Sequence, residues 1–432
     1  MTIDQSITLA VLAGVVAALI WDKVRSDVVA LAGAAILLIT GVVRPSEVQG
    51  AFASPALIAL ASLFVIVYAI ELSGLLDRLI GKAVQLCRAI GVMGLWVTLA
   101  ICGAASAFLN NTPIVVLAAP IVRDTANTLG LDPRRFLIPL SYIAILGGCC
   151  TLIGTSTNLL VADMARIGGE PTFGMFEISP VGLSIALAGG VYLFIVSRWL
   201  GKGDARTIDP DLISMTPGTD AQVGDVRLFV PQRLFNIRQA TISVVVFVGV
   251  ILAATIGVAP IAATAFSGAV LLILLNVISA DEAYSGLRPQ ILLLIAGMVV
   301  VGIAMEESGL ATEATSGLVD AVQPFGPLLA LAVFYGVTLF LTEILSNATV
   351  AVLFAPIAIA LAESLGVSPR PFLVAVMMAA SAAFATPFGY QTNVVVYQIG
   401  GYAYTDFLKF GLPLNIITWI VGLVAITAFF PF

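Results

Sequence analysis

Two stretches in which polar residues interrupt apolar sequence decide the fold of this chain. The first runs from Ser106 to Asn158, opens with SAFLNNTPIVVLAAPIV and closes with TLIGTSTN. The second follows the same plan, with SNAT at residues 346–349 and TPFGYQTN at residues 386–393. Helix-breaking Gly and Pro accompany the small polar residues in both. Interruptions in corresponding positions of two halves predict a binding site inside a membrane protein.

The composition excludes a soluble globular domain. Of the 432 residues, 60% are hydrophobic and 10% are charged, whereas soluble domains carry roughly 25% charged residues. Several apolar runs approach the roughly 20 residues that cross a bilayer as a helix. The short alternating strands of a membrane barrel do not occur in the sequence. We therefore predict an all-α polytopic membrane protein.

Each half is expected to cross the membrane five times, with the fourth crossing interrupted at a polar run. In the first half the expected crossings are 7–20, 28–43, 55–72, 136–166 and 180–200. In the second half they are 240–258, 261–279, 289–305, 372–397 and 410–432. These ten crossings place both ends of the chain on the same side of the membrane.

A pair of apolar segments precedes each interrupted crossing. The pairs are 91–107 with 113–122, and 327–345 with 350–365. Segment 113–122 is only about ten residues long, which is too short to cross a bilayer as a helix. We therefore predict re-entrant helical hairpins at 91–122 and 327–365, each with its polar tip at mid-depth. Non-helical backbone is tolerated at that depth only where it lines a cavity or is buried in protein.

The two halves match one another at a constant offset of 235 or 236 residues. For example, Gly154, Thr157 and Asn158 correspond to Gly389, Thr392 and Asn393. Matches of many residue classes at one offset indicate an internal duplication. Because each half has an odd number of crossings, the second half is upside down relative to the first, which predicts two inverted repeats. The expected organisation is repeat 1 at 1–200, a polar cytoplasmic linker at 201–236 and repeat 2 at 237–432.

The distribution of positive charge predicts the orientation. With the N-terminus outside, 16 of the 19 Lys and Arg residues fall in inside loops. Cytoplasmic loops carry such an excess of positive residues. We therefore expect a cytoplasmic (inner) membrane protein with its N- and C-termini outside.

The polar tips and breaks place neutral amides and hydroxyls at mid-membrane. The candidate substrate-binding residues are Asn110, Asn111, Thr112, Ser346, Asn347 and Thr349 at the tips, with Thr157, Asn158, Thr392 and Asn393 at the breaks. Such groups donate or accept hydrogen bonds, and the helix N-termini that begin beside them favour an anion. The alternative is that small residues only let helices pack closely, but close packing needs no amides at both tips and both breaks.

The same breaks also suit a small hard cation such as Na⁺. Backbone carbonyls freed at a break and side-chain amide oxygens are its preferred ligands. The candidate sodium ligands are Asn111, Gly154, Asn158, Asn347, Gly389 and Asn393. The chain has no His and no spacing typical of a metal site. We therefore expect no cofactor, with Na⁺ as the coupling ion.

Glu343 is a carboxylate inside an apolar segment, three residues before Ser346. Its counterpart in the first half is Ala107. A charged side chain at the centre of a bilayer costs about 2.5–3.5 kcal/mol on the insertion scale. Two interpretations stay open: a cation-coupling or proton-sensing group, or a hydrogen-bonded Glu that closes the hairpin.

Other classes of function lack their signatures. No nucleophile–base pair or Gly-rich nucleotide loop occurs, so an enzyme is not expected. No basic patch occurs, so nucleic acid is not an expected partner. The expected partners are a small anionic substrate, sodium and the lipid bilayer.

At the tips and breaks the sequence resembles the divalent anion:sodium symporter family of the ion-transporter superfamily. That family carries a Ser-Asn-Thr triplet at each hairpin tip, which coordinates both Na⁺ and a substrate carboxylate. Here Asn110-Asn111-Thr112 and Ser346-Asn347-Ala348 occupy those positions. The first triplet begins with Asn rather than Ser and the second ends in Ala rather than Thr, so we expect substrate choice to be decided at these positions.

The resemblance covers nearly the whole chain and implies further properties. Similar permeases carry regulatory domains between their halves, and the linker at 201–236 stands in place of that insertion. The superfamily resemblance also implies a homodimer.

The sequence thus predicts a secondary active transporter that performs sodium-coupled symport of a small divalent anion, sulfate or a C4-dicarboxylate. Moving a dianion into a cell at about −100 mV costs about 4.6 kcal/mol, and three or more co-moved Na⁺ ions reverse the sign. Two alternatives within transport are a Na⁺/H⁺ antiporter and an oxyanion exporter of the arsenite type, from the same superfamily. An ion channel, which requires an open polar pore, is the alternative of a different class.

Overall fold

The computed structural model describes residues 2–21, 24–75, 91–200, 235–310 and 326–432, together with Arg78, Leu79, Lys82 and Glu313. The predicted linker at 201–236 lies outside the described residues except for its last two positions. The regular elements of the described part are all helical. Six helical segments of that part are long and apolar enough to cross a membrane, which confirms the predicted all-α polytopic class.

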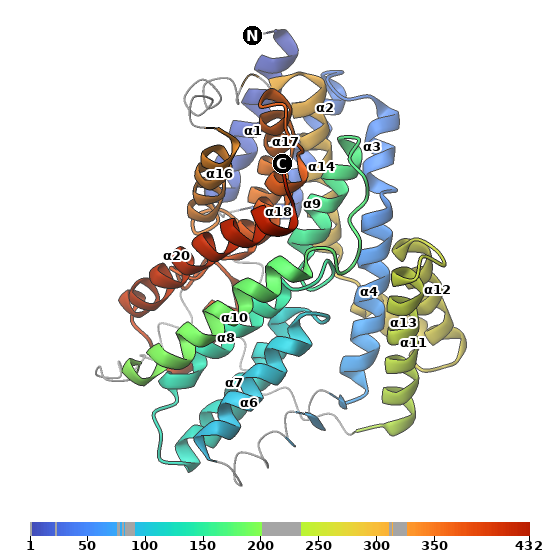
Figure 1. Ribbon diagram of the computed structural model, residues 1–432. Coiled ribbons are helices and arrows are strands. Elements are labelled where there is room, and N and C mark those ends of the chain that lie inside the picture. Colours follow the sequence, from blue (N-terminus) through green and yellow to red (C-terminus); the bar gives the residue numbers. More distant parts are fainter. Residues whose placement is uncertain are drawn as a thin grey trace.

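The helices follow the same order in both halves (Figure 1). Those of the first half are α1 (Ile3–Trp21), α2 (Ser26–Ile39), α3 (Pro45–Phe52), α4 (Pro55–Leu72), α6 (Val92–Ser106), α7 (Asn111–Thr128), α8 (Arg134–Gly148), α9 (Ser156–Ile167) and α10 (Ser179–Val196), followed by a short 3₁₀ turn (Ser197–Trp199). Those of the second half are α11 (Ile237–Thr255), α12 (Ile261–Leu274), α13 (Ala280–Gly286), α14 (Pro289–Glu307), α16 (Pro327–Leu341), α17 (Asn347–Ser364), α18 (Arg370–Ser381), α19 (Gln391–Gly400) and α20 (Tyr404–Phe429).

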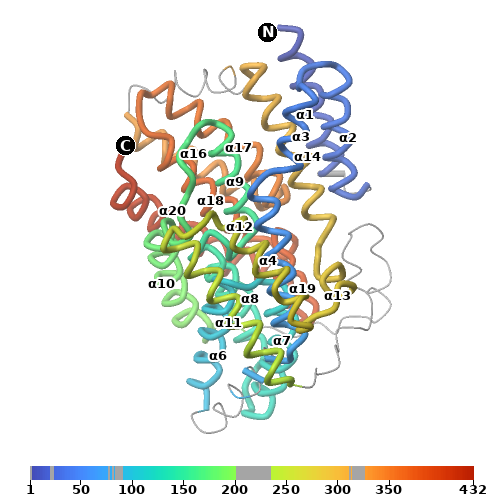
Figure 2. The backbone as a smooth tube through the Cα atoms, turned by 90° about the vertical axis from the view of Figure 1, so that its right-hand side faces the viewer, coloured from blue at the N-terminus to red at the C-terminus, as the bar shows by residue number. Residues whose placement is uncertain are grey.

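The helix pairing follows from the duplication. Helix α2 packs on α14, and α12, which corresponds to α2, packs on α4, which corresponds to α14. In the same way α17 packs on α9 and α7 packs on α19. Each contact is thus made twice with the halves exchanged, as a pseudo-twofold relation requires. The pair α6/α7 lies at one end of the molecule and α16/α17 at the other (Figures 1 and 2).

Some expected boundaries differ from the structure. The second arm of the first hairpin is not a ten-residue segment at 113–122, because α7 has 18 residues and continues through Arg123 and Asp124. These charged side chains are 37% and 69% exposed, so they lower the local hydropathy without breaking the helix. The length of this arm is therefore not evidence for a re-entrant hairpin, and the re-entrant geometry stays a prediction.

The sequence reading also missed α3 and α13 and began the last helix late, at residue 410. Both short helices begin with a Glu at their third position that accepts a hydrogen bond from the residue before the helix: Glu47 from the Arg44 N–H and Glu282 from the Ser279 N–H. These capping contacts are local signals that the apolar pattern does not show. The interruptions of the fourth crossings, in contrast, are confirmed as the breaks α8–α9 and α18–α19.

Glycine pairs let the hairpin helix α6 lie directly against the broken helix α8. A Cβ atom added to Gly147 would overlap the carbonyl oxygen of Gly103. A Cβ atom on Gly103 would lie 2.6 Å from a side-chain carbon of Ile143. The small residues thus set the close approach of the hairpin to the break, as small residues do between membrane helices.

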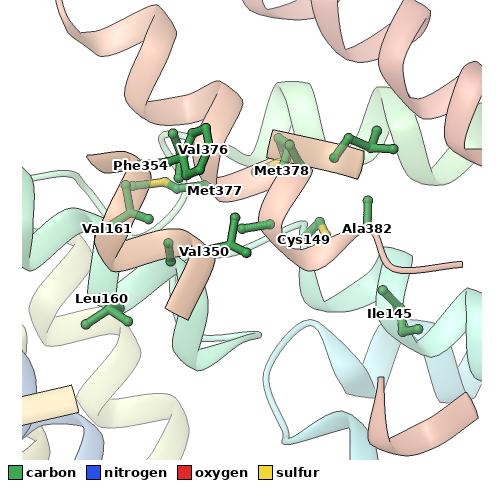
Figure 3. Packing of buried hydrophobic residues seen from close by; sticks show 14 of the residues in the cluster. Ile145, Cys149, Leu160, Val161, Val350, Phe354, Val376, Met377, Met378 and Ala382 are labelled. Atoms are coloured by element: carbon green, nitrogen blue, oxygen red, sulfur yellow. The ribbon is translucent and has the colours of Figure 1, made fainter. Parts of the chain in front are cut away.

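A hydrophobic core lies where α8, α9, α17 and α18 meet (Figure 3). Its buried members include Ile145, Cys149, Leu160, Val161, Val350, Phe354, Met377 and Met378. Buried apolar side chains pack at crystal-like density. This core therefore holds the two breaks and the second hairpin in a defined relation.

Candidate functional site

The tip of the first hairpin is joined to the first break by a chain of hydrogen bonds. Ser106 Oγ donates to Asn111 Oδ1 at 2.5 Å, and Asn110 Oδ1 accepts from the Thr112 N–H at 3.1 Å, which caps α7. The Thr151 hydroxyl donates to the Ala107 carbonyl. The break is closed in turn by Asn158 Nδ2, which donates to the Thr151 carbonyl at 3.0 Å.

The second hairpin and break repeat this arrangement. Thr342 Oγ1 donates to Asn347 Oδ1 at 2.8 Å, and Ser346 Oγ accepts from the Thr349 N–H at 3.2 Å. Asn393 Nδ2 donates to the Thr386 carbonyl at 3.1 Å. Each hairpin is thus joined to the break of its own half, through Thr151 and Ala107 in the first and through Glu343 and Phe384 in the second.

Asn158 and Asn393 are corresponding residues of the two breaks, but their side-chain oxygens differ in hydrogen bonding. Asn393 Oδ1 accepts from the Ser141 hydroxyl at 2.7 Å. Asn158 is fully buried, and within the described residues its Oδ1 has no hydrogen-bond partner. The residue that corresponds to Ser141 is Met377, whose side chain cannot donate a hydrogen bond. Of the two corresponding amides at the breaks, only Asn158 thus has a side-chain oxygen without a hydrogen-bond donor among the described residues.

The backbone oxygens around Gly154, in the same break as Asn158, fit a small hard cation. Backbone carbonyls approach Gly154 closely: a Cβ atom there would overlap the Gly148 oxygen and would lie 2.9 Å from the Ala107 oxygen. Neutral oxygen ligands at a helix break are the donor set that holds Na⁺ in membrane transporters. The described residues contain no group of three or more His, Cys, Asp or Glu side chains that could hold a metal ion.

Glu343 lies in the turn of the second hairpin and binds the break of α18–α19. Its Oε1 accepts from the Phe384 and Ala385 N–H groups, both at 2.8 Å, and from Asn415 Nδ2 at 2.7 Å. Its Oε2 accepts from the Thr386 N–H at 3.0 Å and from the Thr386 hydroxyl at 2.9 Å. Five donors around one carboxylate favour the second interpretation of Glu343, a hydrogen-bonded group that closes the hairpin.

A cavity of about 60 Å³ lies beside the first tip. Its lining residues are Leu60, Leu63, Phe64 and Val67 of α4, Phe108, Asn110 and Asn111 of the first tip, Ile153, Gly154, Thr155 and Ser156 of the first break, and Tyr390 of the second break. None of these described lining residues is charged. The helices α7, α9 and α19 all begin at this cavity, so three positive helix ends lie beside it.

The cavity brings together only part of the predicted site. Asn110, Asn111 and Gly154 line it, whereas the candidates of the second half do not. Thr112 Oγ1 donates instead to Gln391 Oε1 at 3.1 Å, which joins the first tip to α19. Whether the candidate residues bind substrate or sodium stays a prediction.

The sequence reading missed Tyr390 and the apolar wall from α4. Tyr390 lies in the TPFGYQTN run, and its counterpart at the offset of 235 is Thr155. The replacement of a small hydroxyl residue, Thr155, by a large aromatic residue at the corresponding position is visible in the sequence and could have indicated Tyr390. The wall from α4 has no sequence signal, because α4 is apolar on all sides.

The comparisons with known proteins agree with the fold. Over residues 16–367 and 344–431 the chain matches the family model described as citrate transporter, CitMHS. It is 25% identical to the uncharacterized transporter sll0640 of Synechocystis, over 95% of each chain. It is 44% identical to the probable sodium/sulfate cotransporter 3 of Chlamydomonas reinhardtii, over 25% of this chain and 13% of that one.

One solved structure shares the fold. The YdaH transporter of Alcanivorax borkumensis superimposes with a TM-score of 0.60 at 15% sequence identity, over 88% of this chain and 86% of that one. The alignment with the Synechocystis transporter spans 584 positions, more than the 432 residues of this chain, so that relative carries additional residues within the matched region. Because the family model matches most of its length, this chain is an integral membrane transporter that belongs to the citrate transporter (CitMHS) family.

Proposed function

We propose that this transporter couples the entry of Na⁺ to the uptake of a small divalent oxyanion, with sulfate as its first candidate substrate. The observation that carries this proposal is the small uncharged cavity at which three helices begin. Helix N-termini bind anions through free N–H groups and a positive dipole end.

The size of the cavity favours a compact anion over a long one. The cavity of about 60 Å³ is a few times the roughly 10–15 Å³ that one water molecule needs. A tetrahedral oxyanion such as sulfate has five non-hydrogen atoms. A C4-dicarboxylate such as succinate has eight, and citrate has thirteen.

The charge of a dianion must be met without a Lys or Arg side chain in the cavity wall. Helix ends supply partial positive charge, and bound sodium supplies the remainder. We assign the first sodium position to Asn111, Gly154 and Asn158, because Asn111 and Gly154 line the cavity and Asn158, in the same break as Gly154, has an Oδ1 without a hydrogen-bond partner among the described residues. For the second position we propose Asn347, Gly389 and Asn393, which correspond by the repeat, although Asn393 Oδ1 already accepts from the Ser141 hydroxyl.

Relatives support the coupling ion and the class of substrate. Two further matched proteins of Chlamydomonas reinhardtii are named sodium/sulfate cotransporters 1 and 2. The family model is named for citrate, so a larger carboxylate is the second candidate. The five donors around Glu343 stabilise a charged carboxylate, which weighs against the antiporter alternative.

Sulfate is expected to stabilise the purified protein against thermal unfolding only when Na⁺ is present. A ligand at 100 times its dissociation constant adds about 2.7 kcal/mol to the free energy of unfolding. The measurement compares sulfate, succinate, malate, citrate and arsenite, each in sodium chloride and in choline chloride. Equal stabilisation by sulfate in both salts contradicts sodium coupling, and stabilisation by citrate or succinate without sulfate contradicts the proposed substrate.

Replacing Asn158 with Ala is expected to weaken Na⁺ binding on the order of tenfold, which corresponds to about 1.4 kcal/mol. The substitution removes the side-chain oxygen of the first break, which has no hydrogen-bond partner among the described residues. The Na⁺ concentration that gives half-maximal sulfate uptake reports the change. Asn127→Ala, an exposed amide on α7, serves as the matched control and should leave that concentration unchanged.

A further inference from the structure

We infer that the ring of Tyr390 sets the upper size limit of the substrate, as a specificity-determining residue of the cavity. This inference rests on the proposed uptake of a small oxyanion. Tyr390 belongs to the second repeat, yet it lines a cavity whose other polar walls come from the first. Tyr390 therefore contributes a side chain of the second repeat to a cavity built mainly by the first.

The backbone at Tyr390 does not require an aromatic side chain. Tyr390 has φ −144° and ψ 141°, and its repeat counterpart Thr155 has φ −138° and ψ 144°. Both residues occupy the position just before a helix, α19 and α9 respectively. The same backbone conformation thus occurs with a small side chain in one half and a large one in the other. The break does not require the ring, so we assign the ring a role in the cavity.

The hydroxyl of Tyr390 also orients the first tip. It accepts a hydrogen bond from Asn111 Nδ2 at 2.9 Å, while Asn111 Oδ1 accepts from Ser106. The amide of Asn111 is thereby held with its oxygen toward the hairpin and its nitrogen toward the ring. An Asn amide nitrogen carries two protons, so one proton remains to donate to an anion in the cavity.

The consequence for size follows from atom counts. A Tyr side chain has eight non-hydrogen atoms and a Thr side chain has three, so Tyr390→Thr frees the space of about five atoms. The cavity has about 60 Å³, a few times the roughly 10–15 Å³ that one water molecule needs, so the added space is a substantial increase. We therefore expect the enlarged cavity to admit the eight atoms of succinate and to refuse the thirteen atoms of citrate.

The test measures uptake of radiolabelled sulfate into proteoliposomes in the presence of excess unlabelled succinate or citrate. Wild-type uptake should be indifferent to both competitors. Tyr390→Thr should become sensitive to succinate, with at least a tenfold lower inhibitory concentration, and should stay indifferent to citrate. Tyr390→Phe keeps the ring and loses the contact with Asn111, so it should still refuse succinate while its half-saturating sulfate concentration rises severalfold.

Tyr397→Thr is the matched control, because it makes the same change on α19 outside the cavity lining, and it should leave competition unchanged. Succinate sensitivity in Tyr390→Phe, or none in a folded Tyr390→Thr, overturns the inference while sulfate uptake by the wild type upholds the proposed function.

Wild-type protein that takes up no sulfate overturns the proposed function. In that event, a Tyr390→Thr protein that is stabilised by the same anions as the wild type also overturns the size limit. If Tyr390→Thr does not fold, the result with Tyr390→Phe decides the inference.

Discussion

Glu343→Gln is expected to abolish transport and to lower the free energy of unfolding by about 2–4 kcal/mol. The carboxylate accepts from three backbone N–H groups, one amide and one hydroxyl. A Gln side chain has one acceptor oxygen, and its NH₂ group would face donors at the other position. At least one buried N–H group is then left without an acceptor, and the remaining hydrogen bonds lose their charge-assisted strength.

Thermal unfolding of the purified variant, with sulfate uptake measured alongside, checks this expectation. Glu363→Gln changes an exposed carboxylate on α17 of the same hairpin, and such surface substitutions lie within about 0.5 kcal/mol of the wild type. If Glu343→Gln keeps its stability but loses the pH dependence of uptake, Glu343 is a proton-coupling group and the structural assignment is wrong.

Gly154→Ala is expected to reduce sulfate and Na⁺ binding by on the order of 100-fold, or about 2.7 kcal/mol. The added Cβ atom would overlap the Gly148 carbonyl oxygen and would lie 2.9 Å from the Ala107 oxygen and 3.0 Å from the Gly148 carbonyl carbon. All three atoms belong to the backbone, so no side chain can rotate away. Ala107 of the first tip and Gly148 at the end of α8 must therefore move away from residue 154. This movement displaces the cation position and one wall of the cavity together.

The measurement is the sulfate and Na⁺ dependence of thermal stability and of uptake. Gly190→Ala in α10 is the matched control, because no atom lies within 4 Å of its added Cβ. Helix propensity favours Ala over Gly by up to about 1 kcal/mol, so this control should be as stable as the wild type or slightly more so. Unchanged Na⁺ affinity in Gly154→Ala would remove the first break from the proposed cation site.

Apolar pattern and internal repeat were sufficient to predict the architecture of this protein. The hydropathy of the chain indicates membrane helices because backbone groups in lipid must be satisfied within the helix. The offset of 235 or 236 residues places Asn110–Thr112 opposite Ser346–Ala348 before any coordinates are known. Local boundaries were less predictable, as Arg123 and Asp124 show, because a charge at an exposed position lowers hydropathy without ending a helix.

The sequence by itself determined the class of the protein and located the two helix pairs and the two breaks. Only the tertiary structure decided which contacts the unequal positions of the two halves make. Tyr390 crosses from one repeat to Asn111 of the other, Ser141 occupies the oxygen of Asn393 while Asn158 keeps its own free, and Glu343 binds a distant break. These contacts join residues far apart in the chain, so they depend on how helices pack, and a periodic pattern within one segment carries no information about them.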